Sequence, residues 1–185
     1  FIQNNYDLKS SVNAGIADYR VSTYDDKNKW LVTQVKNHYG DTTNYDFVIM
    51  QGGINDMLYR TPIGSLSDGF DASTFDANTF IGGLELYISS VVAKWPNARI
   101  GYIITYFCPN YTERGLKWDF NAHKKYYDAT IQVLNKWNIT YLDLFAGSTE
   151  TQSYTEFLSV YSRTYLPDYL HLNNAGYDRI SPYIY

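Results

Sequence analysis

The 185-residue sequence contains a single cysteine, Cys108, and three histidines, His38, His123 and His171. One cysteine excludes an internal disulfide and any metal site built from several cysteines. No two of the histidines have the sequence spacing of paired metal ligands. The sequence therefore predicts no metal site, and we expect no cofactor.

Basic clusters and long hydrophobic runs are also missing. No run of Lys and Arg is longer than a pair and the net charge is −4, which argues against a nucleic-acid partner. No stretch reaches the roughly 18 apolar residues of a membrane span. No signal-peptide pattern is present, so a mature secreted protein and a cytoplasmic protein would both look like this. Of the two, we favour an extracellular or cell-surface location.

Aromatic side chains are abundant: 20 Tyr, 9 Phe and 4 Trp make up 18% of the chain. Tyrosine buries a large ring while keeping a polar tip, so it suits core edges and sugar-binding surfaces alike. A compositional bias of the source organism is the simpler explanation for this excess. Two aromatic-rich segments, residues 106–111 and 153–165, could line an acyl or sugar site or form core edges, and the sequence leaves both interpretations open.

Short apolar runs alternate with longer periodic ones along a chain whose length suits one domain with one core. The short runs predict strands at residues 11–15, 45–51, 99–106 and 139–144. Helical spacing of apolar residues predicts helices within residues 24–39, 77–95 and 118–137. This alternation predicts a parallel sheet with helices packed on it.

Segments 52–74 and 145–170 show neither pattern and are predicted to be loops. Ligands of parallel α/β sheets bind at the carboxyl ends of strands, where these loops begin, so they are candidate functional segments. Two further residues receive structural interpretations. Asn174 is a candidate cap of the last helix, and His123, next to two lysines, is expected to face solvent.

The segment QGGINDM, residues 51–57, directly follows a predicted strand. Its paired glycines, including Gly53, allow a sharp turn and a close approach to a ligand. Asn55 then offers a side-chain amide that could donate a hydrogen bond to a developing oxyanion. The alternative is a plain strand-exit turn, because Gly, Asn and Asp are all turn formers.

Asp168 and His171 lie three positions apart in the segment LPDYLHLNNAGYDRI. A histidine base needs its far ring nitrogen held in one tautomer, and a nearby carboxylate can do that. The alternative is that Asp168 only organises the loop while His171 sits on the surface. The pair is therefore a candidate base with its orienting acid.

Together the two motifs resemble the GDSL-like or SGNH hydrolase family. SVNAGIADYRVS, residues 11–22, looks like the family's second segment, where a strand runs into a glycine-containing oxyanion turn. ITYLDLF, residues 139–145, resembles its last strand. The resemblance spans essentially the whole chain. It implies a three-layer α/β/α sandwich with a flavodoxin-like parallel sheet, in one SGNH-hydrolase-like domain over residues 1–185.

The resemblance also implies roles for individual residues. His171 would be the general base and Asp168 its orienting acid, while Asn55 would be an oxyanion donor whose turn Gly53 shapes. The family's second-segment glycine falls on Asp18, whose backbone N–H would be a further donor. A carboxylate beside a developing oxyanion is unfavourable unless it points away or is protonated, so Asp18 puts the oxyanion hole in question.

The family's nucleophile is the serine of a Gly-Asp-Ser motif after the first strand, and that tripeptide does not occur in this sequence. Ser10 and Ser11 precede the second strand of the implied fold, so neither suits the role. In the strand order 2-1-3-4-5 the first strand is central, and without it two strands would have unpaired edges. We therefore expect a chain truncated at both ends, with an upstream segment or a second chain supplying strand 1 and the serine.

Two functions follow from these observations. The first is a serine-dependent ester hydrolase acting on an acyl or acetyl ester, with a small-molecule or carbohydrate ester as substrate. The alternative is a catalytically inactive carbohydrate-binding module on the same fold, which recognises sugar through its tyrosines. A nucleotide-binding α/β domain is disfavoured because no Gly-rich phosphate loop is present.

Overall fold

The computed structural model describes residues 8–37, 44–107, 112–113, 116–117, 119–146, 164–168 and 170–183. The chain packs as two compact units. The first unit consists of Phe1–Ile16, Tyr106–Phe120 and Leu144–Tyr185. The second unit consists of Ala17–Thr105 and Asn121–Asp143.

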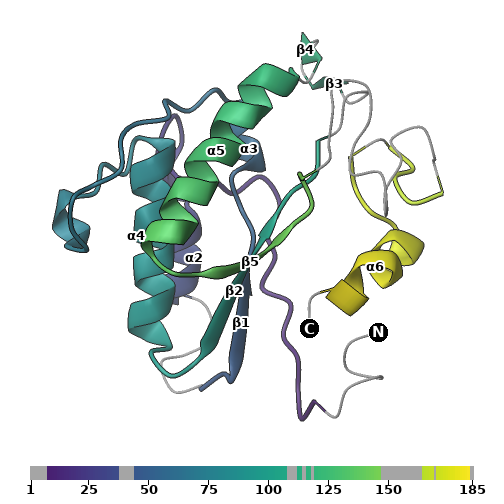
Figure 1. Cartoon of the computed structure of the whole chain (residues 1–185), viewed down its shortest axis with the longest axis horizontal. Coiled ribbons are helices and arrows are strands. Elements are labelled where there is room, and N and C mark those ends of the chain that lie inside the picture. Colours follow the sequence, from purple (N-terminus) through teal and green to yellow (C-terminus); the bar gives the residue numbers. More distant parts are fainter. Residues whose placement is uncertain are drawn as a thin grey trace. The chain divides into compact units, whose positions relative to one another are not determined.

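A three-stranded parallel sheet in the order β1-β2-β5 is the centre of the second unit (Figure 1). Its strands are β1 (Phe47–Met50), β2 (Arg99–Ile104) and β5 (Thr140–Asp143). They confirm the strands predicted at 45–51, 99–106 and 139–144, each slightly shorter in the structure. The predicted α/β class, a parallel sheet flanked by helices, is confirmed with them.

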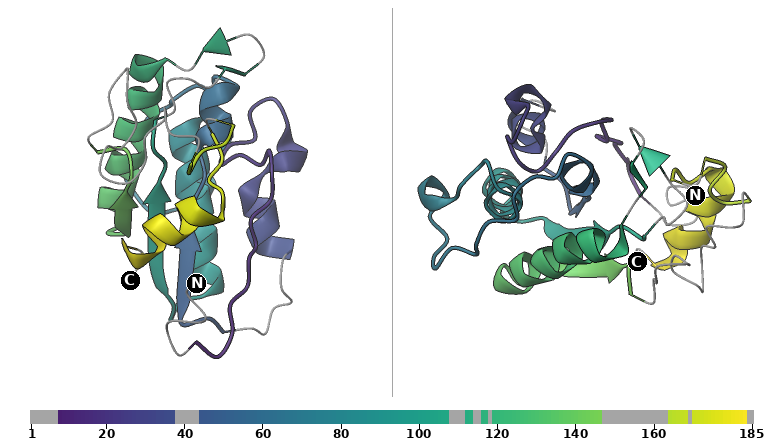
Figure 2. Two further views of the ribbon diagram at one scale, coloured as in Figure 1. Left: turned by 90° about the vertical axis from the view of Figure 1, so that its right-hand side faces the viewer. Right: turned by 90° about the horizontal axis from the view of Figure 1, so that it is seen from above.

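The helices α4 (Phe80–Lys94) and α5 (Phe120–Lys136) connect β1 to β2 and β2 to β5. Both connections step in the same direction across the sheet, so right-handed crossovers place both helices on the same face, as Figures 1 and 2 show. Met50 and Tyr102, paired in register, are buried on these strands. The sheet and the helices thus share one apolar core.

Local signals define the ends of α4. The Thr79 hydroxyl accepts a hydrogen bond from the Gly82 N–H at 3.2 Å and caps the first turn. Gly82 and Gly83 allow close packing, because a Cβ on Gly83 would lie 2.5 Å from the Val21 carbonyl oxygen. The helix ends at Lys94, ahead of Pro96, as the sequence predicts.

Two sequence predictions are wrong in part. The helix expected within 24–39 is divided into η1 (Lys27–Lys29) and α2 (Leu31–Asn37) by Trp30, which is extended and forms a bridge with Arg20. The segment 52–74, predicted to be a loop, contains α3 (Ile54–Leu58) and η2 (Ala72–Thr74). Elements this short lie below the length at which hydrophobic periodicity can be recognised.

Residues 11–15, predicted to form a strand, have no regular structure. The Asn13 side chain accepts a hydrogen bond from the Gly15 N–H at 2.9 Å, and the whole segment is exposed. Such a local side-chain bond offers the backbone an alternative to strand pairing. The prediction of a strand here is therefore wrong.

Lys136 of α5 ties the segment after α3 to the helices. Its ammonium lies 2.5 Å from the fully buried carboxylate of Glu85 and donates to the carbonyl oxygens of Ser67 and Gly69 at 2.8 and 2.6 Å. Phe70 packs edge-on against Trp137, with ring centroids 4.9 Å apart. The segment between α3 and α4 is thus held against α4, which carries Glu85, and against α5, which carries Lys136.

His123 lies inside the second unit, which contradicts the expectation that it faces solvent. Only 7% of the residue is exposed, and burial lowers its pKa to about 3. It stands seven residues before Thr130, another buried residue of α5, and so belongs to the inner face of the helix. The seven-residue spacing from Thr130 indicates the burial of His123 better than the neighbouring lysines do.

Burial of neutral His123 predicts acid sensitivity. Below pH about 6.5 the unfolded chain protonates this histidine, whereas the folded chain does not until about pH 3. The free energy of unfolding should therefore fall with pH across this window, by up to about 1.4 kcal/mol per unit from this residue. Urea unfolding of the parent and of His123→Leu at several pH values measures this slope. An equal slope in both proteins would contradict the prediction.

The first unit contains the antiparallel strands β3 (Thr112–Glu113) and β4 (Leu116–Lys117), the helix α6 (Asn174–Ile180) and η3 (Ser181–Tyr183). Asn173 caps α6, because its side-chain oxygen accepts a hydrogen bond from the Gly176 N–H at 3.0 Å. The prediction of Asn174 as the cap is wrong by one position, since Asn174 is already the first helical residue.

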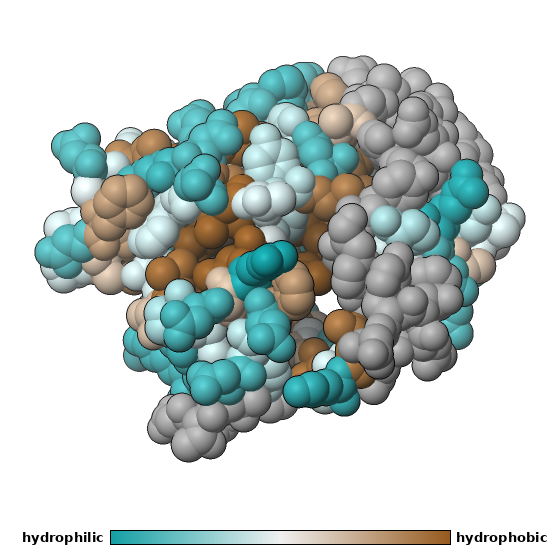
Figure 3. Space-filling view, turned by 60° about the horizontal axis from the view of Figure 1, so that its bottom comes forward, coloured by the Kyte–Doolittle hydropathy of each residue, from teal (hydrophilic) through white to brown (hydrophobic). Residues whose placement is uncertain are grey.

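Hydrophobic side chains are also present at the surface. Phe47 and Ile49 of β1 are 55% and 49% exposed, and they alternate with Val48 and Met50, which turn toward the helices. Figure 3, seen from the lower end of Figure 1, shows hydrophobic surface gathered among hydrophilic side chains. Among the described strands, β1 also lies at one edge of the sheet.

Candidate active site

The turn between β1 and α3 requires a glycine at position 53 and is closely packed at Gly52. Gly53 has a φ of +96°, and a Cβ there would lie 2.9 Å from the Phe80 ring. A Cβ on Gly52 would lie 2.9 Å from the Leu31 side chain. The Tyr102 hydroxyl holds the turn by donating to the Gly52 carbonyl oxygen at 2.9 Å. Asn55 therefore follows the strand by a short and closely packed path.

Asn55 is held by the segment that resembles the family's oxyanion turn. Its Nδ2 donates to the Tyr19 carbonyl oxygen at 2.9 Å, and the side chain is half-buried. An amide nitrogen carries two N–H groups, so this bond orients the amide and leaves a second N–H for another acceptor. That chemistry suits a pre-oriented donor.

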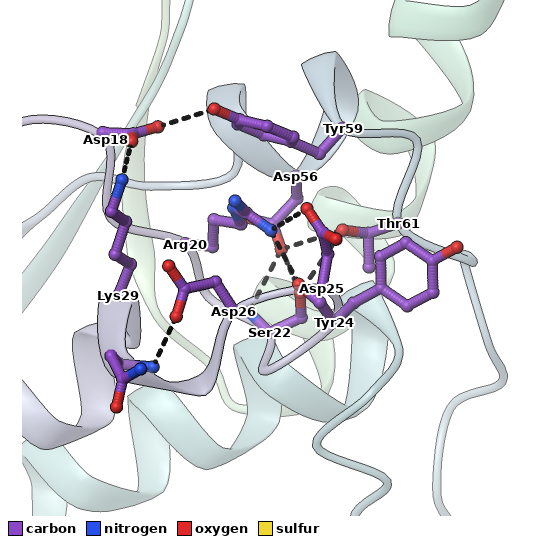
Figure 4. A network of polar contacts seen from close by, with 11 residues as sticks. Asp18, Arg20, Ser22, Tyr24, Asp25, Asp26, Lys29, Asp56, Tyr59 and Thr61 are labelled. Carbon is purple, nitrogen blue, oxygen red and sulfur yellow. Dashed lines mark hydrogen bonds and ion pairs between the residues drawn. The ribbon is translucent and has the colours of Figure 1, made fainter.

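Asp56 is a structural anchor that the sequence analysis did not single out. Its fully buried carboxylate accepts hydrogen bonds from the N–H groups of Val21 and Ser22 at 2.9 and 3.1 Å. The hydroxyls of Ser22 and Thr61 add bonds of 2.5 and 3.4 Å (Figure 4). Desolvation raises the pKa of Asp56, and these hydrogen bonds oppose the rise. Asp56 thereby fastens α3 to residues 21–22.

Asp18 occupies a left-handed turn position, with a φ of +64°. Its carboxylate forms an ion pair with Lys29 and accepts a hydrogen bond from the Tyr59 hydroxyl at 3.1 Å (Figure 4). The hydrogen bond from Lys29 lowers the pKa of Asp18, and it outweighs the opposing effect of desolvation. The carboxylate is therefore ionised, and its charge is balanced by a direct cationic partner.

Arg20 is a second buried anchor that the sequence analysis missed. Its guanidinium lies 3.7 Å from the centroid of the Tyr59 ring, a cation–π arrangement. Nη1 donates to the Tyr24 carbonyl oxygen at 2.7 Å and lies 3.4 Å from Asp25. The two contacts of Tyr59, with Arg20 and with Asp18, join the turn at residue 18 to the end of α3.

Asp168 and His171 are in direct contact in the first unit. The His171 Nδ1 lies 2.6 Å from one Asp168 oxygen, while the other accepts from the N–H groups of Leu170 and His171 at 3.0 and 2.7 Å. Partial burial raises the pKa of Asp168, but these hydrogen bonds outweigh it and lower the pKa to about 2. An ionised partner at Nδ1 favours the tautomer in which Nε2 can accept a proton. The His171 side chain is 75% exposed.

Neighbouring contacts brace this pair. Tyr106, which is 5% exposed, donates from its hydroxyl to the Leu170 carbonyl oxygen at 2.6 Å. The Asn173 side chain donates to the Thr164 carbonyl oxygen at 2.6 Å, and Leu166 is fully buried. The carbonyl held by Tyr106 belongs to the residue directly before His171. Tyr106 is therefore a positioning residue for the pair.

Removing only the Tyr106 hydroxyl should weaken this positioning. We expect Tyr106→Phe to release the Leu170 carbonyl and to loosen the contact between Asp168 and His171, because the hydroxyl that holds the residue before His171 is lost. NMR spectroscopy of the His171 imidazole, which reports its hydrogen bond at Nδ1, measures this change. Tyr177→Phe, at an exposed tyrosine of α6, is the matched control. A change of the same size in both variants would contradict a positioning role.

The structure gathers the predicted site residues in two groups. Gly53, Asn55 and Asp18 belong to the second unit, whereas Asp168 and His171 belong to the first.

Within the described residues, no group of three or more His, Cys, Asp or Glu side chains could hold a metal ion. Cys108, and most of the aromatic segments 106–111 and 153–165, lie outside the described residues. Among the helices that the structure describes, none has the length and apolar character needed to cross a membrane.

A model of the GDSL-like Lipase/Acylhydrolase family matches residues 2–179. The chain belongs to this family. No curated protein matches it. Among solved structures, a protein from Lactobacillus plantarum is similar with a TM-score of 0.70 and 23% identity, over 98% of this chain and 81% of that one. A structure named as a candidate GDSL-like lipase from Bacteroides ovatus has a TM-score of 0.57 and 16% identity, over 90% of this chain and 65% of that one.

Membership in the GDSL-like family supports an acyl-ester hydrolase at the level of reaction class. The two structural likenesses show a shared fold. They carry no conclusion beyond the fold, because both sequences are less than 25% identical to this chain. The segments on which the resemblance was based are the ones that position Asn55 and that carry the Asp168–His171 pair. The match of the family model over residues 2–179 confirms the predicted membership in the family.

Proposed function

We propose that the protein is a serine-dependent ester hydrolase in which His171 is the general base. The observation that carries this proposal is the 2.6 Å contact of the His171 Nδ1 with Asp168, whose pKa of about 2 keeps it ionised. A serine hydroxyl attacks the ester carbonyl and passes its proton to His171 Nε2. His171 then protonates the leaving alcohol, and water hydrolyses the acyl-enzyme by the same route. Asp168 stabilises the imidazolium between these steps.

The oxyanion donors in this proposal come from the second unit. Asn55 contributes the second N–H of its amide, and the turn at residue 18 contributes a backbone N–H. The contacts of the Asp18 carboxylate with Lys29 and Tyr59 support this assignment, because they balance its charge and orient it. Gly53 keeps the turn before Asn55 in its left-handed conformation.

The nucleophile in this proposal is a serine outside residues 1–185, supplied with strand 1 by an upstream segment or a second chain. Two observations support it. No Gly-Asp-Ser tripeptide occurs within the sequence, and among the described strands β1 lies at an edge, where unpaired backbone groups can accept another strand.

Fluorophosphonate labelling of the full-length protein, followed by peptide mapping, tests the proposal. We expect the label on a serine upstream of Phe1 or on an accompanying chain. A label on a serine within residues 1–185 would keep the hydrolase and overturn the origin of its nucleophile. Absence of a label on folded protein would overturn the hydrolase and favour an inactive carbohydrate-binding module.

Asp18 offers a separate test of the oxyanion turn. In Asp18→Gly the backbone N–H remains, the left-handed conformation becomes easier and a negative charge is removed. We expect kcat/KM for an ester to be retained or raised in the full-length protein. A tenfold loss, roughly the scale of one weakened donor, would show that the carboxylate itself contributes to catalysis. Lys29→Met, which removes the partner and leaves Asp18 charged, should lower kcat/KM.

A further inference from the structure

A small cavity lies next to the turn that carries Asn55. Its volume is about 20 Å³, which leaves room for about one water molecule or methyl group. All of its lining residues belong to the second unit. Gly52, Gly53 and Ile54, which directly precede Asn55, form one wall. A group held in the cavity therefore contacts the turn that directly precedes the proposed oxyanion donor.

The polar groups in the wall are directed to partners within the protein. The Tyr126 hydroxyl donates to the Thr61 carbonyl oxygen at 2.5 Å, and the Tyr127 hydroxyl donates to Asp143 at 2.9 Å. The Thr130 hydroxyl donates to the Tyr126 carbonyl oxygen at 2.8 Å. His123, also in the wall, is neutral at physiological pH because burial lowers its pKa to about 3. These groups add no net charge to the cavity, so it suits an apolar group better than an ionic one.

Two of the side chains that line the cavity, Phe80 and Tyr102, are difficult to displace. Phe80 is 1% exposed and packs edge-on against Tyr126, with ring centroids 5.0 Å apart. A Cβ on Gly53 would lie 2.9 Å from the Phe80 ring. The Tyr102 hydroxyl is bonded to the Gly52 carbonyl oxygen. Met57, 8% exposed and unbranched, is the most adaptable side chain of the lining.

We propose that this cavity receives the methyl end of the substrate's acyl group and restricts the enzyme to acetyl esters. The inference rests on the proposed ester hydrolysis and names its substrate class. The cavity volume accommodates an acetyl methyl, whereas a butyryl chain has to displace Met57 or Phe80. The acyl group, rather than the alcohol, is assigned to the cavity because the wall is continuous with the turn of Asn55.

Chain-length selectivity in the full-length protein is the test. We expect kcat/KM for p-nitrophenyl acetate to exceed that for p-nitrophenyl butyrate by about tenfold or more, since extra methylenes have no room. Met57→Ala enlarges the cavity and should raise the butyrate-to-acetate ratio by about tenfold. Met50→Ala is the matched control, because Met50 is equally a buried methionine but does not line the cavity.

The outcomes separate this inference from the function on which it rests. Absence of both fluorophosphonate labelling and turnover would overturn the hydrolase itself. Labelling together with a preference for butyrate or octanoate would keep the hydrolase and overturn the acetyl cavity. An equal change of the ratio in Met57→Ala and Met50→Ala would also overturn it. If Met57→Ala does not fold, the chain-length profile of the parent decides.

Discussion

Replacing His171, the proposed general base, by alanine should lower kcat/KM of the active enzyme for an acetyl ester by about 10²–10⁴-fold, the usual contribution of such a base. The fold should be unaffected, because the His171 side chain is 75% exposed and its ring is hydrogen-bonded to Asp168, which is three residues away. Substitutions at such surface positions usually change stability by less than about 0.5 kcal/mol. Ester hydrolysis rates and thermal unfolding, measured on the same preparation, check both parts.

Two companion variants sharpen this experiment. Asp168→Asn keeps the size of the side chain but removes the charge that favours proton acceptance at His171 Nε2, so it should also lower kcat. Asp178→Asn, at an exposed position in α6, should leave the rate unchanged. Turnover by His171→Ala at nearly the parental rate would remove His171 from the mechanism, whatever the other variants show.

The largest effect on stability is expected at Asp56. Asp56→Ala would leave the N–H groups of Val21 and Ser22 and two hydroxyls without their common acceptor, in a place closed to solvent. Unsatisfied buried donors cost about 1–3 kcal/mol each, so we expect the free energy of unfolding to fall by about 3 kcal/mol or more. Urea unfolding measures this loss.

Asp56→Asn tests whether the charge or only the shape matters. An amide offers one acceptor oxygen where the carboxylate offers two, and its NH2 group would face backbone donors. This variant should therefore also be destabilised, although less than Asp56→Ala. Asp68→Ala, at an exposed aspartate of the same unit, is the control and should change little. Equal stability of Asp56→Ala and Asp68→Ala would contradict the anchoring role.

The same anchor links stability to the proposed chemistry. Asp56 fastens α3 to residues 21–22, while Asn55, its neighbour in the helix, is bonded to the Tyr19 carbonyl oxygen. Both contacts join the turn after β1 to the segment that contains Asp18. A folded Asp56 variant should consequently lose ester hydrolysis as well as stability, because the proposed oxyanion donors, Asn55 and the turn at residue 18, depend on this junction.

Local features of the sequence were sufficient for much of the fold. Strands β1, β2 and β5 and helices α4 and α5 agree with the predicted segments because the hydrophobic periodicity that defines them acts within a few residues of the chain. The contact between Asp168 and His171 was predictable for the same reason, since three positions separate the two residues. The expected strand at 11–15 failed because a strand needs a partner, and its own Asn13 supplied a local alternative.

By itself, the sequence determined the α/β class, the main elements and the spacing of the candidate base and acid. Only the tertiary structure decided which polar residues are buried. Asp56 reaches Val21 across 35 positions, and Tyr106 reaches Leu170 across 64. The burial of His123 likewise depends on the packing of α5 against the sheet. Such contacts require the whole chain to be folded, because a side chain acquires distant partners only when packing excludes water from both.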